Sequence, residues 1–397
     1  MDRPTDHEFG TGVDGRRTSG MAADVGESAY NSSQRAMTAI VHVTPELQPM
    51  IGGIADYAAI LGRAMSEREI RQHYLVASHA ALAYKQCIRA SFPQALVLDS
   101  TTSNDLLRGL RDLEAETVLL HYSGYGYAPR GAPFWLVERL GCWKELRAHH
   151  RLIVMFHETW ASGLPWQSSF WLSPLQYWCV ARIARLADAV VTNTSYYRAR
   201  LESLLRPGTP IQVQPIFSNI GEPDAVPAFD EREPVCVLFG RGVTRRRTNE
   251  RFRRHFDELR TLGIERLIEI GVEPEITARL EWPFPVESLG PRKTSEISAI
   301  MSRVKYGLFD CPVHVAGKSG VLAALAAHGI VPIHPEGEGT FEGLEFGRDT
   351  VNISAVSQVS DLRAARDGAS VRAWYRKHRL DRQVSETWLR LLSREEL

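Results

Sequence analysis

The sequence lacks several features that would point to particular classes of protein. Its five cysteines include no C-x-x-C pair, which argues against a zinc site and a disulfide framework and favours a reducing compartment. No apolar run approaches the roughly 20 residues that a membrane span needs. The N-terminus also lacks the charged and then apolar layout of a signal peptide. We therefore expect a cytoplasmic protein without an integral membrane segment, with peripheral contact at the inner face of the membrane as the alternative.

The chain also lacks an excess of charge of either sign. Its 397 residues contain 47 Lys plus Arg and 47 Asp plus Glu, so no global field attracts it to nucleic acid or to an acidic membrane surface. Any basic site must then be local, and we expect no nucleic-acid partner. Hydrophobic residues make up 44% of the chain, which is enough to fill the cores of two domains of ordinary size.

Two segments lack the pattern of a folded domain. Residues 1–36 are rich in Gly, Ser, Asp and Arg and bury too little apolar surface to offset ordering entropy, so we predict a disordered extension. Residues 223–234 are rich in proline and acidic residues without periodicity, which predicts a linker. These segments place the two domains at 37–222 and 235–375, followed by a C-terminal helix at 376–397.

Short apolar runs rich in β-branched residues alternate with longer helical patterns in both domains. This alternation is typical of parallel sheets with crossover helices. The expected strands are 39–43, 73–77, 95–98, 117–121, 152–156, 189–192 and 211–215, then 235–239, 266–270, 304–309, 330–334 and 350–353. We therefore predict two doubly wound, Rossmann-like α/β domains, with ligands in a cleft beyond the carboxyl ends of the strands.

The most informative local pattern is a lysine-bearing glycine turn that runs into a short helical segment. Ser319 is a preferred N-cap residue, Ala and Leu residues follow Gly320, and Gly329 stands where a left-handed residue ends a helix. The orphan N–H groups at the helix start and the charge of Lys318 favour a phosphate group. We predict a diphosphate site at Lys318, Ser319 and Gly320. The alternative is a small-residue helix packed on a sheet, with a solvated lysine.

Two further glycine turns follow predicted strands. Gly52 and Gly53 follow the first strand and allow the backbone to approach a phosphate or sugar before a helix begins. Gly240 and Arg241 follow the first strand of the second domain, and an arginine there suits bidentate contact with phosphate. A flexible turn at the first position and a solvated cationic helix face after the second are the alternatives.

The predicted strand at 152–156 is followed by His157, Glu158 and Trp160. An imidazole and a carboxylate at a strand end can contact a substrate hydroxyl or exchange a proton, and an indole can stack on a sugar. A hydrogen-bonded structural histidine and a packed tryptophan are the alternatives.

In their order and spacing, these pieces resemble the GT-B glycosyltransferases, in particular the nucleotide-sugar-dependent enzymes with a Gly-Gly loop, the retaining group 1. The resemblance extends over residues 38 to about 390. The matching segments are 52–57, 156–158, 190–195, 215–220, 239–241 and 318–320.

The resemblance implies a nucleoside-diphosphate sugar as donor substrate in the second domain. Arg241 and Lys318 would neutralise the charge on the leaving diphosphate, which a divalent metal does in other transferases, and Gly52 and Gly53 would lie near that diphosphate. It therefore implies no metal and no cofactor.

On the acceptor side, the resemblance implies that the first domain binds a glycan, a lipid-linked or a small-molecule hydroxyl acceptor in polysaccharide or glycoconjugate biosynthesis. His157 would lie near the transferred sugar, and Asp56, Glu158 and Trp160 would contact the acceptor or the sugar. The sugar would be transferred with retention; if the reaction inverts, Asp56 or His157 is the first candidate for a general base.

The chain departs from the family at one motif. Many relatives carry Glu-x7-Glu, whose second carboxylate holds the donor ribose, whereas this chain has Ala316 and Ala324 at the corresponding positions. Alanine offers no side-chain hydrogen bond, so nucleotide recognition must differ, use backbone groups or be lost. Two alternatives therefore stay open: a non-catalytic sugar-nucleotide or glycan-binding protein, and a nucleotide-sugar epimerase. Without a G-x-G-x-x-G fingerprint, a dinucleotide oxidoreductase is disfavoured.

Overall fold

The computed structural model describes residues 39–100, 103–272, 282–335, 337–354 and 361–393. The extension predicted at 1–36 lies outside the described residues. Residues Ala39–Leu397 form one compact unit. The boundaries of the two domains stay predictions.

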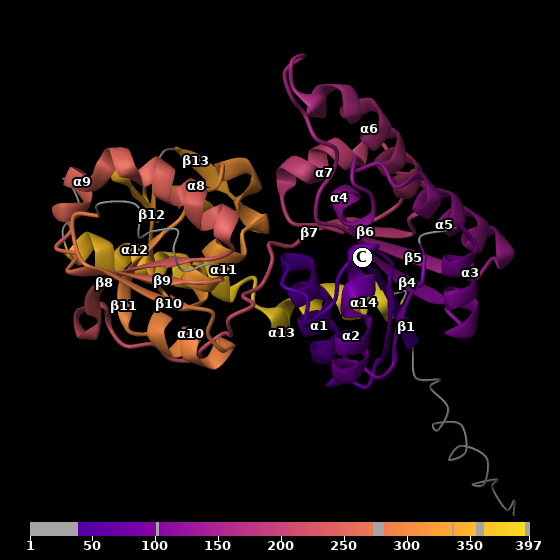
Figure 1. Cartoon of the computed structure of the whole chain (residues 1–397), viewed down its shortest axis with the longest axis horizontal. Coiled ribbons are helices and arrows are strands. Elements are labelled where there is room, and N and C mark those ends of the chain that lie inside the picture. The colour runs from indigo at the N-terminus through magenta and orange to yellow at the C-terminus, as the bar shows by residue number, and fades with distance from the viewer. Residues whose placement is uncertain (1–38, 101–102, 273–281, 336, 355–360, 394–397) are drawn as a thin grey trace, which may run out of the picture. The chain divides into compact units, whose positions relative to one another are not determined.

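The first sheet has seven parallel strands in the order β3-β2-β1-β4-β5-β6-β7 (Figure 1). The strands are β1 Ala39–Thr44, β2 Arg71–Val76, β3 Ala95–Val97, β4 Thr117–Tyr122, β5 Arg151–Phe156, β6 Ala189–Thr192 and β7 Ile211–Val213. The helices between them are α1 Gly53–Ser66, α2 Lys85–Ser91, α3 Ser103–Asp112, α4 Gly124–Tyr127, α5 Phe134–Leu146, α6 Ser168–Leu186 and α7 Ser195–Glu202.

Helices cover both faces of this sheet, which explains why its strands are apolar at successive positions. Alternate residues of a strand point to opposite faces. Accordingly, Val41 and Val43 of β1 pack with α3, α5 and α6, whereas Ile40 packs with α1 on the other face. All three side chains are fully buried or nearly so.

The second sheet has six parallel strands in the order β10-β9-β8-β11-β12-β15. The strands are β8 Glu233–Phe239, β9 Arg266–Ile270, β10 Val286–Gly290, β11 Val304–Leu308, β12 Val331–His334 and β15 Val351–Asn352. Its helices are α8 Gly242–Phe252, α9 Phe256–Arg260, α10 Thr294–Met301, α11 Gly320–Ala327 and α12 Asp361–Arg376. Val235 and Val237 face one core cluster and Cys236 and Leu238 the other, so this sheet is also covered on both faces.

Three strands were not predicted. β10 is a partly exposed edge strand whose polar residues hide its pattern. β13 Gly339–Phe341 and β14 Leu344–Phe346 form an antiparallel hairpin. Its two-residue turn places Glu342 and Gly343 at φ of 45° and 84°, the geometry of a tight hairpin turn that favours glycine at the second position.

The C-terminal part of the chain contributes to the core of the first sheet. After α12, it is helical over α13 Leu380–Gln383, a π-helical turn Val384–Trp388 and α14 Leu389–Ser393. Trp388 is fully buried in the cluster that contains Ile40 and Leu119. Gln214 Nε2 donates to Thr387 Oγ1 at 2.6 Å.

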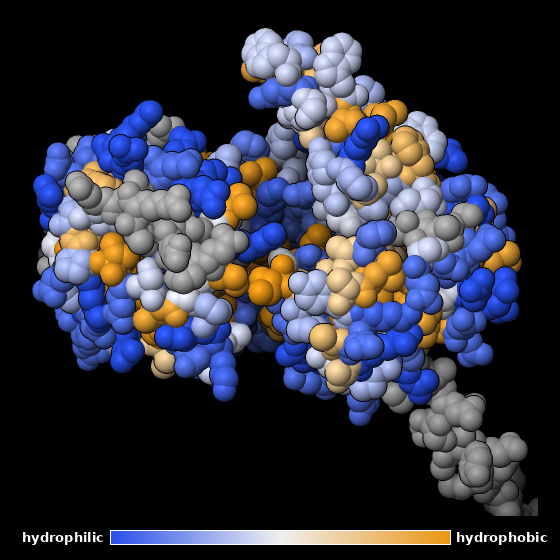
Figure 2. All heavy atoms as spheres, viewed as in Figure 1, coloured by the Kyte–Doolittle hydropathy of each residue, from blue (hydrophilic) through white to orange (hydrophobic). Residues whose placement is uncertain are grey.

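No helix in the described parts of the chain is long and apolar enough to cross a membrane. On the face seen in Figure 2, hydrophobic residues occur in small groups between hydrophilic ones.

Candidate active site

Polar residues that can contact a ligand follow three neighbouring strands of the first sheet. Ser123 follows β4, His157 follows β5 and Asn193 follows β6. The last residues of these strands, Tyr122, Phe156 and Thr192, are paired in register. Because the strands are parallel, the three residues lie along one edge of the sheet, at the carboxyl ends where open α/β sheets bind ligands.

His157 is the outer member of a buried chain of three histidines. Its Nε2 lies 3.3 Å from Nδ1 of His121, whose Nε2 lies 2.9 Å from Nδ1 of His42. Nε2 of His42 lies 2.6 Å from Oε1 of Gln72. Gln72 is anchored in turn, because its Nε2 donates to the Ile70 carbonyl at 2.8 Å. Of the three histidines, only His157 was predicted as a site residue.

The hydrogen bonds of Gln72 assign the tautomer of each ring. A carbonyl oxygen only accepts, so His42 carries its proton on Nε2 and accepts at Nδ1. His121 therefore donates from Nε2 and accepts at Nδ1, and His157 donates from Nε2. Nδ1 of His157 is left as a hydrogen-bond acceptor.

Burial keeps this chain neutral. It lowers the pKa of His157 from 6.5 to about 3, with the charge of Lys318 adding to the effect, and it lowers the pKa of His42 to about 4 against the opposing hydrogen bond to Gln72. Burial and the neighbouring histidines hold the pKa of His121 well below its usual value. A neutral imidazole with a fixed tautomer suits hydrogen bonding to a sugar hydroxyl better than proton exchange near pH 7.

Lys318 ends a 3-10 turn at Val313–Lys318 and forms an ion pair with Glu158, at 3.3 Å from Nζ to Oε1. Ser123 Oγ donates to the other Glu158 oxygen at 3.3 Å. Burial opposes the charge on Lys318, but Glu158 and Tyr197 together hold the pKa of Lys318 above its usual value. About one third of the lysine side chain is exposed, at 34%, so it is a charged group that solvent and ligands can reach.

The start of α11 has the features predicted for it. Ser319 is the N-cap, its hydroxyl accepts from the Leu322 N–H at 3.2 Å, and Gly329 follows the helix end with a φ of 63°. Within the described part of the chain, the N–H groups of Gly320 and Val321 make no hydrogen bond. The helix therefore presents two free donors beside the charge of Lys318.

The Gly240 turn lies next to this helix start. A side chain at Gly240 would come within 3.3 Å of Val321, and the backbone there has a φ of 133° that favours glycine. Arg241 is the N-cap residue of α8 and its side chain is exposed, without a hydrogen bond or ion pair to any residue that the structure describes. The structure leaves Arg241 available to a ligand.

A different arginine holds that turn in place. Arg245 is fully buried, donates from Nε to the Gly240 carbonyl at 3.0 Å and pairs with the buried Glu269. Arg245 is therefore not part of the solvated cationic helix face that was the alternative for the residues after Arg241. Its partner lies on β9, which the local sequence could not reveal.

At the Gly-Gly loop, α1 is capped by a carboxylate of the chain itself. Glu46 Oε1 accepts from the N–H groups of Ile54 and Ala55 at 3.1 and 3.2 Å. A side chain at Gly52 would overlap this carboxylate, whereas Gly53 faces open space. The N–H groups that were expected to bind a phosphate therefore already donate to Glu46, whereas the space beside Gly53 is open to a ligand.

Asp56 is engaged on both oxygens. Gln48 Nε2 and Asn219 Nδ2 each donate to it at 2.7 Å. Asn219 Oδ1 is buried, has no partner among the described residues and lies 3.9 Å from the position of a side chain at Gly320. Asp56 therefore orients Asn219 towards the start of α11 rather than standing free as a base.

Trp160 lies in a packed environment. The Arg200 guanidinium is 3.8 Å from the centre of its indole ring, and Tyr177 packs edge-on against it at 5.0 Å. Arg200 Nη2 also donates to the Trp160 carbonyl at 2.9 Å. The packing role left open above therefore fits Trp160 better than sugar stacking.

Buried polar atoms without partners mark the same edge of the first sheet. Among described residues, Thr159 Oγ1 and both amide atoms of Asn193 make no hydrogen bond, as is the case for Asn219 Oδ1. Buried polar groups are nearly always satisfied, so such atoms are candidates for contact with a polar ligand. None of these residues was predicted as a site residue, although each follows the end of a predicted strand.

Ala316 and Ala324 belong to the core of the second sheet, with 1% and 0% of their surface exposed. Their side chains cannot contact a ribose. Among the residues that the structure describes, no group of three or more His, Cys, Asp and Glu side chains has the arrangement of a metal site.

No protein-family model matches the chain, and no curated protein matches its sequence. Solved structures match its fold. An alpha-glucosyltransferase in complex with UDP is 11% identical, with a TM-score of 0.56 over 90% of this chain and 100% of that one. The chain has the GT-B fold. The predicted fold class is thus confirmed.

Two further structures with this GT-B fold have similar scores. Sucrose-phosphate synthase from Thermosynechococcus elongatus is 12% identical, with a TM-score of 0.60 over 90% of this chain and 100% of that one. The pneumococcal O-GlcNAc transferase GtfA, in complex with UDP and GlcNAc, is 9% identical, with a TM-score of 0.61 over 91% of this chain and 99% of that one. At these identities the likeness concerns the fold.

Proposed function

We propose that this GT-B protein is a glycosyltransferase that moves a sugar from a nucleoside diphosphate to a hydroxyl group of an acceptor. The observation that carries the proposal is the start of α11, where Lys318 is charged and the N–H groups of Gly320 and Val321 are free. Free helix N–H groups beside a cation bind phosphate. The neighbouring Gly240 turn adds the exposed Arg241. Solved structures of the same fold that contain UDP support the proposal.

Catalysis in this proposal is electrostatic. As the bond between the sugar and the diphosphate breaks, negative charge builds on the leaving group, and Lys318 and Arg241 stabilise it with the α11 donors. One well-placed group of this kind contributes about 3 kcal/mol to lowering the barrier. These cations would act in place of a divalent metal, so activity should persist when EDTA is present.

Glu158 gives the site a way to respond to the donor. Without ligand it is the counter-ion of Lys318. A bound diphosphate competes for that lysine and releases the Glu158 carboxylate to accept a hydrogen bond from the sugar or the acceptor hydroxyl. Nδ1 of His157 is the second acceptor at this edge.

Retention is the proposed stereochemical outcome. Both oxygens of Asp56 are held by amide groups, so Asp56 is not placed as a free nucleophile or base. The donor phosphate itself would then assist removal of the acceptor proton. Proton NMR of the product formed from an α-linked donor tests this, because retention gives an α-linked product.

Donor recognition cannot use the family's second glutamate, since Ala324 replaces it. We propose that backbone groups and the unpartnered amides of Asn193 and Asn219 take part in binding the donor. Bacterial polysaccharide or glycoconjugate assembly, with a glycan, lipid-linked or small-molecule acceptor, is the proposed setting.

The test is a thermal-shift and turnover screen of the purified chain against nucleoside diphosphates and their sugars, beginning with UDP. A ligand at 100 times its dissociation constant stabilises the fold by about 2.7 kcal/mol. Lys318→Ala should abolish the thermal shift. Lys377→Ala replaces an exposed lysine directly after α12 and should keep the shift. Thermal stabilisation without transfer of the sugar would favour a binding protein. Interconversion of the donor sugar would favour an epimerase. No response to any nucleotide would overturn the proposal.

A further inference from the structure

We propose that the part of the chain around α12 carries a second anion site, a pocket that binds the phosphate group of a small metabolite. It is formed by Arg232, Arg372 and Arg376 and shares no residue with the candidate active site. The proposal does not depend on the glycosyltransferase activity.

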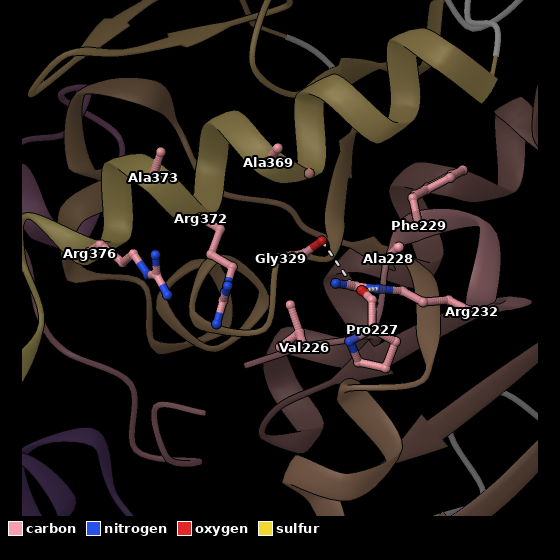
Figure 3. A pocket seen from close by; sticks show the side chains of 11 residues that line it. Val226, Pro227, Ala228, Phe229, Arg232, Gly329, Ala369, Arg372, Ala373 and Arg376 are labelled. Atoms are coloured by element: carbon pink, nitrogen blue, oxygen red, sulfur yellow. Dashed lines mark hydrogen bonds between the residues drawn. The ribbon is translucent and has the colours of Figure 1, made fainter. Parts of the chain in front are cut away.

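The pocket is a cavity of about 260 Å³ between the segment before β8, Gly329 after the end of α11 and one side of α12. Arg372 and Arg376 extend from α12 towards the segment that carries Val226 and Pro227, and Arg232 lies beside Gly329 (Figure 3). Three guanidinium groups, one from the segment before β8 and two from α12, therefore line one small space.

These arginines are held by neutral groups. Arg232 is 7% exposed and donates to the carbonyls of Pro227, His328 and Gly329 at 2.9 to 3.1 Å. Arg372 and Arg376 both donate to the Asp224 carbonyl at 3.0 Å. The backbone thus fixes the guanidinium groups without neutralising them.

None of the three guanidinium groups has a carboxylate partner of its own within the described part of the chain, although the Asp224 carboxylate partly offsets the charge around Arg372. None of the three arginines forms an ion pair with any described residue, and the Asp224 carboxylate pairs with Arg379, at 3.4 Å. Burial and then Arg372 lower the pKa of Arg232, as burial and then Arg376 and Arg379 lower that of Arg372. Arginine stays protonated despite such shifts, so the space is a concentration of positive charge that an anion would relieve.

Small residues keep the space open. A side chain at Gly329 would come within 3.1 Å of Arg372 Cδ and 3.2 Å of Arg232 Nη2, which is the point where the two guanidinium-bearing side chains approach each other. Across from it, α12 presents Gly368, Ala369 and Ala373. Nη2 of Arg232 makes no hydrogen bond to the described residues and lines this opening.

The size and the donors indicate the ligand class. Sites for drug-sized molecules span roughly 300 to 1,000 Å³, so this cavity is too small for a nucleotide sugar. Guanidinium groups match phosphate in geometry and can bind two of its oxygens at once. Inorganic phosphate and the phosphate monoester of a small sugar share this chemistry.

The experiment measures binding of inorganic phosphate and of glucose 6-phosphate to the full chain by calorimetry, with glucose as the uncharged reference. Both phosphates should bind, and glucose should not. Tighter binding of the sugar phosphate would identify a metabolite site, and equal binding a site for the phosphate group alone. Arg372→Gln should weaken either by about tenfold or more, because a hydrogen bond to a charged group is lost.

Two further variants separate binding from folding. Arg232 is not substituted, because its hydrogen bonds to three backbone carbonyl groups also stabilise the fold. Ala369→Leu, at an exposed position of the wall, should fill the cavity and abolish binding while the charges stay. Arg390→Gln, at an exposed arginine outside the pocket, should bind as the wild type does.

In Lys318→Ala, which disables the proposed donor site, the phosphate binding that Arg372→Gln weakens should persist. The proposal is overturned if neither phosphate binds at millimolar concentration. It is equally overturned if Arg372→Gln and Ala369→Leu bind normally, or if only Lys318→Ala loses binding.

Discussion

Replacing His157 by asparagine should reduce the loss of stability that acid causes. Burial, and then the charge of Lys318, lower the pKa of His157 to about 3 in the folded chain. In the unfolded chain a histidine titrates near 6.5. Between these pH values the unfolded state binds more protons than the folded state. The free energy of unfolding therefore rises with pH, and it decreases as the pH falls below 6.5.

The magnitude follows from these two pKa values. One such histidine costs the folded state about 2 kcal/mol between about pH 7 and pH 5. His42 and His121 act in the same direction, because burial lowers their pKa values as well. Since whole domains are stable by only about 5 to 15 kcal/mol, the histidine chain should make this protein markedly sensitive to acid.

The assay is urea unfolding, followed by fluorescence, at about pH 7, 6 and 5. His157→Asn should narrow the difference in unfolding free energy between the extremes by about 2 kcal/mol, whatever its stability at neutral pH. His79→Asn, at an exposed histidine, is the control and should keep the wild-type difference. If His157→Asn shows the wild-type difference, the imidazole is not held neutral and the tautomer assignment fails.

The remaining predictions concern the site and the core. Lys318→Ala should lower kcat by about 10²-fold or more, as loss of an oxyanion donor does; a kcat within threefold of wild type would contradict its role. Glu158→Gln removes the competitor for Lys318, so calorimetry should show tighter UDP binding together with slower transfer, and weaker binding would argue against competition. Gly317→Ala would place a carbon within 2.3 Å of the Asn193 carbonyl oxygen and should cost about 1 to 3 kcal/mol in urea unfolding. Trp388→Ala should cost about 3 to 5 kcal/mol, and an unchanged unfolding midpoint would show that its burial contributes little.

The sequence was most informative where chemistry is local. The Ser319 cap bonds to an N–H three residues away, and Gly329 ends the same helix, so both could be read from neighbouring positions. Strands that are buried on both faces were also predicted, because apolar residues at successive positions mark them in the sequence. The edge strand β10 was missed because its partly exposed, polar residues hide that signal, and β13 and β14 were missed because strands of three residues are too short to show a pattern.

Contacts between distant segments could not be predicted. Glu46 caps α1 from the loop before it, Arg245 of α8 pairs with Glu269 of β9, and His121 of β4 joins His42 of β1 to His157 after β5. In each case the residue types were visible, but their partners depend on the order of strands in the sheet. The partners of Asp56 and Trp160 could not be predicted for the same reason, since Asn219 and Arg200 come from distant segments.

The burial of Trp388 has a consequence for the order of events during synthesis. Ile40 of the first strand and Leu119 of the fourth share a cluster with Trp388, Val384 and Leu391, close to the other end of the chain. A ribosome must therefore deliver nearly the whole polypeptide before this face of the first sheet can be covered. Until then the face is an exposed apolar surface of the kind that chaperones recognise and that drives aggregation. A recombinant fragment that stops at the linker should meet the same difficulty, so the whole chain is the unit to express.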